Sequence, residues 1–135
     1  MRILYTNDGG GVSVVVPSPS WVGTMEELAA KVVPENEPYK IVEDSVIPTD
    51  RTFRDAWENY ESVNVSLVKA KEITKTRLRE ERKPLLEAQD VLFMKAQETS
   101  SDTAAIITEK QRLRDITTSA DSASTLDELK GLSAA

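Results

Sequence analysis

Apolar and polar positions in the first part of the chain follow the pattern of short β-strands. Ile3-Leu4-Tyr5 and residues 12–16 are rich in β-branched and aromatic side chains, and Asn7 to Gly11 lie between them. Asn, Asp and Gly readily adopt turn conformations, so the pattern predicts a β-hairpin. Three consecutive glycines also occur in phosphate-binding loops, but no Gly-Lys-Ser/Thr follows and the next segment has strand character. A simple turn is therefore favoured.

Two more elements are expected before residue 65. Thr24 and Glu27 have the spacing of a capping box, which predicts a short helix running to about Val33. Leu28 and Val32 are expected on its buried side. A weak alternation over residues 39–43 predicts a third strand.

From about residue 66 to residue 98 the apolar period changes to that of an α-helix. The apolar positions lie within a sector of about 120° at about 100° per residue, and they are Leu67, Ala70, Leu78, Leu85, Ala88, Leu92 and Ala96. Pro84 interrupts this run and predicts either a kink or a second helix in line with the first.

The rest of the chain predicts a return helix. Residues 99–102 form a short polar turn, and the stripe Ile106, Leu113 and Ile116 follows it. A turn this short makes the two helices antiparallel. A second capping-box pattern at Thr125 predicts a final short helix, whose apolar residues are Leu126, Leu129 and Leu132.

The predicted fold class is therefore α+β. A small module containing a β-hairpin is expected over residues 1–65, and an antiparallel helical hairpin with a short terminal helix over residues 66–135. Four of the five glycines and six of the seven aromatic residues precede residue 65, which supports this division.

The segment PTDRTFRDAWENYE gathers aromatic residues and charges of both signs. A helix starting at Asp50 or Thr52 would place Phe53 and Trp57 on one face. Ion pairs four residues apart would then be available on its surface, namely Asp50–Arg54, Arg51–Asp55 and Arg54–Glu58. Such a helix either holds its aromatic side chains in the core of the module or presents them to a partner, because Trp, Tyr and Arg are enriched at interface hot spots. The two roles are compatible.

The stripe on the long helix is broader than a short return helix can cover. Leu86 and Phe93 flank the seam made by Leu85 and Leu92. Homo-oligomerisation or burial against a partner is expected to cover the remainder. The candidate partner-binding residues are Arg51, Phe53, Arg54, Trp57, Tyr60, Leu86 and Phe93.

Composition argues against catalysis and against a metal or cofactor. The chain has no cysteine and no histidine, which excludes thiolate nucleophiles, imidazole zinc sites and triads built on histidine. The paired carboxylates are adjacent in sequence, so their side chains point in different directions. No catalytic, cofactor-binding or metal-ligating residues are predicted, and the chain is not expected to be an enzyme.

Charge offers one alternative function. Residues 1–65 hold 5 Lys+Arg and 11 Asp+Glu, a net charge of −6, which is unlike a nucleic-acid-binding module. Residues 69–83 are rich in Lys and Arg, and Lys71, Lys75, Arg79 and Arg82 lie within about 80° of one another on a helical wheel. A nucleic-acid-binding or regulatory role for this run is the alternative. Interleaved glutamates and the lack of a stacking aromatic favour a solvated flank, or one that faces the acidic front half.

No apolar run approaches the roughly 18 residues of a membrane span, and the start MRILYTNDGGG does not resemble a secretory signal. No membrane partner is expected, and the expected location is the cytoplasm.

Several stretches together resemble a family of small proteins encoded beside tail genes in tailed bacteriophages and prophages. They are MRILYTND, PSPSW before TMEELAAKVVP, YKIVEDSVIPTDRTFRDAWE, KAKEITKTRLREERKPLLEAQDVLFMKA and KQRLRDITTSADSASTLDELKGL. The resemblance covers nearly the whole chain, and the DRTFRDAWE core followed by the basic helix and KPLLE is its most specific part. It implies a tail-fibre-associated or tail-assembly-chaperone-like protein. Tail or tail-fibre proteins would be its partners, in the host cytoplasm during assembly or in the virion tail. The resemblance carries no catalytic residues.

Overall fold

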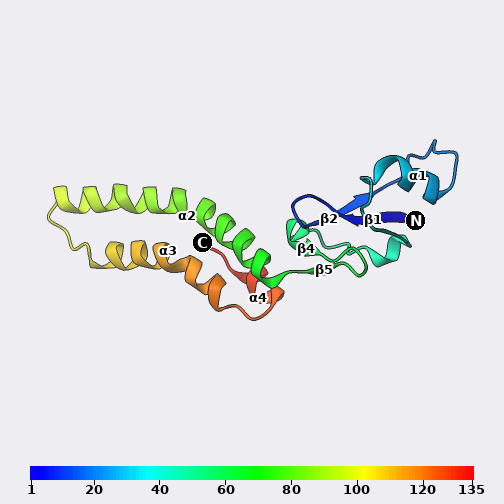
Figure 1. The fold of residues 1–135 in the computed structure, drawn as a ribbon. Helices are drawn as coiled ribbons and strands as arrows, with labels where there is room; N and C mark the ends of the chain where they lie inside the picture. Colours follow the sequence, from blue (N-terminus) through cyan, green and yellow to red (C-terminus); the bar gives the residue numbers. More distant parts are fainter. The chain divides into compact units, whose positions relative to one another are not determined.

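The computed structural model describes residues 1–135, which form an α+β fold divided into two compact units, Met1–Lys69 and Ala70–Ala135 (Figure 1). A small antiparallel sheet lies in the first part of the chain, and two long helices pack against each other in the second, which confirms the predicted fold class. The elements in order are β1 (Arg2–Thr6), β2 (Val12–Val15), α1 (Met25–Val32), β3 (Tyr39–Val42), η1 (Asp44–Val46), η2 (Arg54–Ala56), β4 (Trp57–Glu58), β5 (Asn64–Val65), α2 (Leu67–Glu98), α3 (Ala104–Ser122) and α4 (Leu126–Gly131).

The predicted hairpin forms the core of the sheet, whose strand order is β2-β1-β3 with both neighbours antiparallel to β1. Asn7 organises the turn, because its Oδ1 accepts hydrogen bonds from the backbone N–H of Gly9 at 3.1 Å and of Gly11 at 3.0 Å. The N–H of Gly10 donates to the carbonyl of Asn7 at 2.9 Å. All three glycine N–H groups therefore have acceptors inside the turn, which leaves none for a phosphate.

Successive residues of β1 point to opposite faces of the sheet, and both faces are covered. Ile3 packs on one face with Leu28 and Ala29 of α1. Leu4 packs on the other face with Ile47 and Trp57, which lie in the segments that follow β3. The small unit thus has two thin apolar layers, one on each side of three strands.

The predicted helix over residues 50–58 is wrong. The segment forms a single 3₁₀ turn, η2, followed by strand β4, in which Trp57 pairs with Val65 of β5. The expected ion pairs Arg51–Asp55 and Arg54–Glu58 do not form, because residues in this conformation do not share a helical face.

Helix α1 is capped as predicted. The Glu27 N–H donates to Thr24 Oγ1, and the Thr24 N–H donates to the Glu27 carboxylate, so both halves of the capping box are present. Leu28 is buried, as expected. Val32, which was expected to be buried, is 40% exposed, and Ala29 takes the inner position because the sheet lies on that side of the helix.

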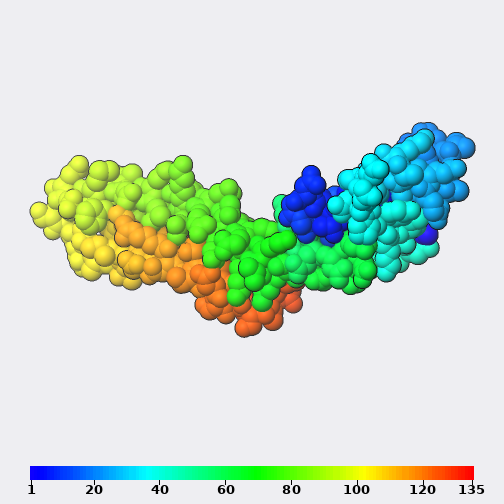
Figure 2. Space-filling view, in the orientation of Figure 1, coloured from blue at the N-terminus to red at the C-terminus, as the bar shows by residue number.

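The second unit contains the predicted helical hairpin. Helix α2 runs unbroken through Pro84, so the proline does not start a second helix. Helix α3 returns along it, and the atoms of the two helices lie directly against each other (Figure 2). Helix α4 is capped by Thr125, whose Oγ1 accepts from the Glu128 N–H at 3.2 Å. No helix of the chain combines the length and the apolar character that crossing a membrane requires.

The apolar stripe of α2 is buried only in part. Ala70, Leu78 and Ala96 are buried, whereas Leu92 is 47% exposed and Ala88 is exposed as well. The stripe is therefore only partly covered within the chain, as its breadth predicted, and Ala88 and Leu92 belong to the uncovered part. Helix α3 covers only one sector of α2, and these two residues lie outside it.

Candidate partner-binding surfaces

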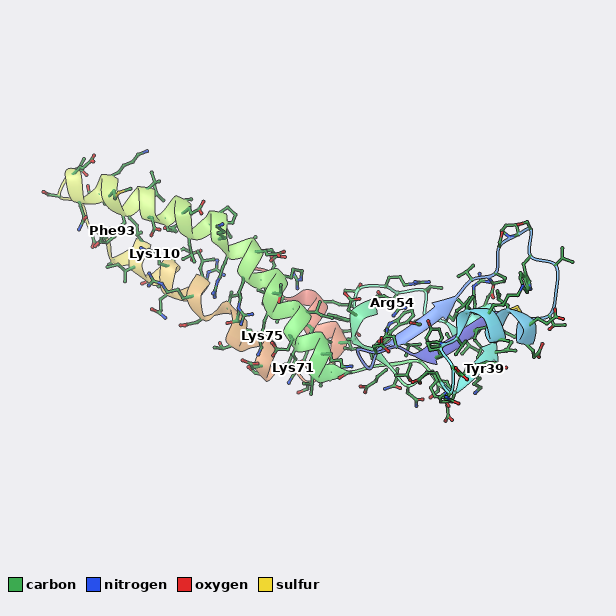
Figure 3. All side chains as sticks on the ribbon, turned by 45° about the horizontal axis from the view of Figure 1, so that its top comes forward. Tyr39, Arg54, Lys71, Lys75, Phe93 and Lys110 are labelled. Atoms are coloured by element: carbon green, nitrogen blue, oxygen red, sulfur yellow. The ribbon has the colours of Figure 1, made fainter.

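Two arginines lie on the buried ring of Trp57 in the first unit. The guanidinium carbon of Arg54 is 4.4 Å from the ring centroid, and that of Arg51 is 5.3 Å from it. Arg54 is held further by Nη2, which donates to the Val12 carbonyl at 2.7 Å (Figure 3). The Arg51 side chain is exposed and makes no hydrogen bond or ion pair. The aromatic ring therefore contacts both guanidinium groups.

These arginines border a pocket of about 440 Å³, which we call the arginine pocket. Its other charged residues are Arg2 and Asp44, and its apolar wall includes Val14 and Ile47. The Asp44 carboxylate accepts from the amino-terminal ammonium at 2.9 Å and pairs with Arg2 at 3.1 Å. The hydrogen bond from the ammonium is the main cause that lowers the pKa of Asp44, with Arg2 adding to it.

The aromatic candidates of this segment lie in or beside the core. Trp57 is 1% exposed and Phe53 is 5% exposed, while Tyr60 is half-buried against the Trp57 cluster. The indole Nε1 of Trp57 is buried and has no hydrogen-bond acceptor. In this unit a partner can therefore reach the arginines, while the Trp57 ring beneath them serves as their support.

In the second unit, charged side chains of α2 and α3 bind the backbone of residues 129–134, which we call the C-terminal segment. Arg77 donates to the carbonyls of Leu129 and Leu132, at 3.3 and 2.8 Å. The Glu81 carboxylate accepts from the Ala134 N–H at 3.1 Å, and Arg112 of α3 donates to the Ala134 carbonyl at 2.9 Å. The hydrogen bond from Ala134, followed by that from Arg77, lowers the pKa of Glu81.

The face of α2 that carries Arg77 and Glu81 continues beyond the C-terminal segment. Residues three and four apart on a helix are neighbours on one face. The same face therefore carries Pro84, Ala88, Val91 and Leu92, and we call these four residues the open face of α2. All four are exposed, Val91 at 45% and Leu92 at 47%. These four side chains are apolar, the charged residues Glu87 and Lys95 border them, and no segment of the chain covers them.

Leu86 and Phe93 lie elsewhere on the helix and are half-buried. Lys110 of α3 lies 5.4 Å from the centroid of the Phe93 ring and pairs with Asp90 at 2.5 Å (Figure 3). Phe93 therefore helps to join α2 and α3.

Much of the basic run of α2 is engaged within the unit, so the expectation of a solvated flank is wrong for these side chains. Lys71 donates to the Asp121 carbonyl at 2.9 Å, and Arg82 donates to the Arg114 carbonyl at 2.7 Å. Lys75 pairs with Asp121 at 2.6 Å, and the hydrogen bond to Asp121, with that to Glu72, raises the pKa of Lys75. These cations stabilise the hairpin because they bind carbonyls and a carboxylate of α3.

The structure contains no group of three or more carboxylates that could hold a metal ion.

The inferences from sequence missed Arg2 and Asp44 as parts of the arginine pocket, and no local pattern identifies them, because only the sheet brings them to residues 47–54. They also missed the role of Arg77 and Glu81. The spacing of four residues between these two was the available signal.

Comparisons with protein-family models, curated proteins and solved structures find no match to this chain.

Proposed function

We propose that this chain is a bacteriophage tail accessory protein without catalytic activity, which binds a tail or tail-fibre protein. The tail context rests on the resemblance of its sequence motifs to small proteins encoded beside phage tail genes. The lack of cysteine and histidine is consistent with a role in binding. The protein acts in the host cytoplasm during assembly, either as a chaperone or as a component that stays in the virion.

The open face of α2 is the observation that carries the proposal. The C-terminal segment covers this side of the helix as far as Glu81, and four exposed residues then extend the same face. Exposed apolar stripes beside charged residues are typical of protein interaction sites. An apolar segment of the partner would cover Pro84, Ala88, Val91 and Leu92, as the C-terminal segment covers the adjoining part.

The test is quantitative mass spectrometry of purified phage particles, combined with co-purification from infected cells. A fixed number of copies per particle identifies a virion component. Absence from particles together with co-purification of a tail or fibre protein identifies a chaperone. Absence from particles without a tail or fibre partner in infected cells would contradict the proposal.

A further inference from the structure

We propose that the arginine pocket of the first unit is a binding site for an acidic side chain of a protein partner. The ligand class is a carboxylate, and the groups that recognise it are the guanidiniums of Arg51 and Arg54. The inference deepens the proposed function and rests on it, because the carboxylate is supplied by a protein partner.

The two guanidiniums are held in place before any ligand arrives. Both lie on the Trp57 ring, at 5.3 Å for Arg51 and 4.4 Å for Arg54, and Arg54 is also bonded to the Val12 carbonyl. A planar guanidinium presents paired N–H donors that match a carboxylate. Since the ring and the carbonyl fix these groups, less side-chain entropy is lost when a ligand binds.

The one carboxylate that lines the pocket does not pair with these two arginines. Asp44 is the only carboxylate in its lining, and the amino-terminal ammonium and Arg2 already pair with it. Arg51 and Arg54 have no carboxylate within ion-pair distance. The surrounding module has a net charge of −6 over residues 1–65, from 5 Lys+Arg and 11 Asp+Glu. A local cationic site on an acidic module rejects acidic partners that do not fit it, which favours specificity.

The size and lining of the pocket favour a side chain over a free anion. Its volume of about 440 Å³ exceeds what one inorganic anion requires and lies within the usual range of about 300–1,000 Å³ for ligand sites. Val14, Val16, Ile47 and Pro48 add apolar surface beside the arginines. Such a lining suits the methylene groups of a glutamate and its neighbours in a peptide.

The test uses the full chain labelled with ¹⁵N, and NMR follows the Trp57 indole N–H and the arginine Nε–H signals during titration. The probes are a capped peptide of alternating Glu and Gly, the same peptide with Gln in place of Glu, and inorganic phosphate. We expect the Glu peptide to shift these signals saturably, the Gln peptide to leave them unchanged, and phosphate to bind more weakly than the Glu peptide.

Arg51→Gln is the test variant, because Arg51 is exposed and makes no hydrogen bond whose loss would affect folding. It should weaken binding of the Glu peptide about tenfold or more, the equivalent of about 1.4 kcal/mol. Lys31→Gln is the matched control. Lys31 lies 4.9 Å from the centroid of the Trp21 ring, which is the same kind of contact outside the pocket. This variant should bind the Glu peptide as the unchanged chain does.

Four results would overturn the inference: no saturable shift with the Glu peptide, equal shifts with the Gln peptide, tighter binding of phosphate than of the Glu peptide, or equal losses in the two variants. None of them bears on the open face of α2. If substitutions on that face abolish capture of a tail protein while the Glu peptide fails to bind, the proposed function stands and this inference falls.

Discussion

At the scale of single residues, Trp57 stabilises the first unit through three kinds of contact. Its ring fills the layer beneath Leu4 and Val12, its backbone pairs with Val65, and its outer side carries the two arginines. The unpaired indole N–H is the one defect, since a buried donor without an acceptor costs about 1–3 kcal/mol. Packing of the ring outweighs that cost.

Trp57→Ala should therefore destabilise the first unit by about 3–5 kcal/mol, because it leaves a large cavity. Trp57→Phe should cost clearly less, since it keeps an aromatic ring and removes the unpaired donor. Urea unfolding followed by tryptophan fluorescence reports on this unit alone, because both tryptophans of the chain lie in it. Trp21 remains as the reporter in the Ala variant and in the Phe variant.

A loss below about 1 kcal/mol for Trp57→Ala would contradict the core role of the residue. Arg51→Gln is the control at the same site, and it should change the unfolding midpoint little, because the Arg51 side chain is exposed and makes no hydrogen bond.

Glu81 makes the attachment of the C-terminal segment depend on pH. Hydrogen bonds from Ala134 and Arg77 lower its pKa below the ordinary value of 4.5 in the folded chain. A lowered folded pKa means that the stabilisation is complete above the unfolded value and is lost as the pH falls through the folded value. The second unit should thus lose stability from about pH 5 downward.

The Glu81→Gln variant should lose less stability over this acid range than the unchanged chain does. Urea unfolding followed by circular dichroism at 222 nm measures the difference, and the Ala134 amide signal in NMR reports the contact itself. An identical pH dependence in the two proteins would contradict the role of Glu81.

At the scale of elements, helix α2 contains Pro84 in its interior, where proline is unfavourable. Pro84 lacks the N–H that would bond the Glu80 carbonyl, and its side chain is exposed. Because proline is about 3 kcal/mol less favourable than alanine inside a helix, Pro84→Ala should stabilise the second unit by up to that amount. Thermal unfolding followed at 222 nm tests this, with Lys83→Ala as the neighbouring control. A lower midpoint in Pro84→Ala would show that the helix depends on the proline.

Elements whose signals are local were predicted from the sequence. The turn residues between two apolar runs predicted the β1–β2 hairpin, and Thr24 with Glu27 predicted the start of α1. The period and the polar turn at residues 99–102 predicted the hairpin of α2 and α3. In each case the residues that specify the element lie within it, so no distant contact has to be known.

Elements that depend on distant partners were not predicted. Residues 50–58 satisfy the spacing of a helix, but Trp57 pairs with Val65 and packs against Leu4, and these long-range contacts decide the conformation. The arginine pocket could be inferred only in part. Residue type pointed to Arg51 and Arg54, whereas Arg2 and Asp44 reach the pocket through strand pairing and the turn η1.

At the scale of the whole molecule, the open face of α2 predicts self-association when no partner is present. Light scattering at high protein concentration should show species larger than a monomer, because association removes the apolar stripe from water. Leu92→Glu should restore the monomer. A monodisperse monomer that binds no dye specific for apolar surfaces would contradict this prediction.

Capture of a tail protein by two matched variants tests the central claim most directly. Leu92 and Ile107 are 47% and 52% exposed, and Ile107 lies on α3, outside the open face of α2. Glutamate at either position adds the same charge at little cost to folding. We predict that Leu92→Glu lowers recovery of the tail or tail-fibre protein from infected cells about tenfold or more, while Ile107→Glu retains it. Equal recovery in both variants, or equal loss in both, would contradict the claim that the open face of α2 is the binding surface.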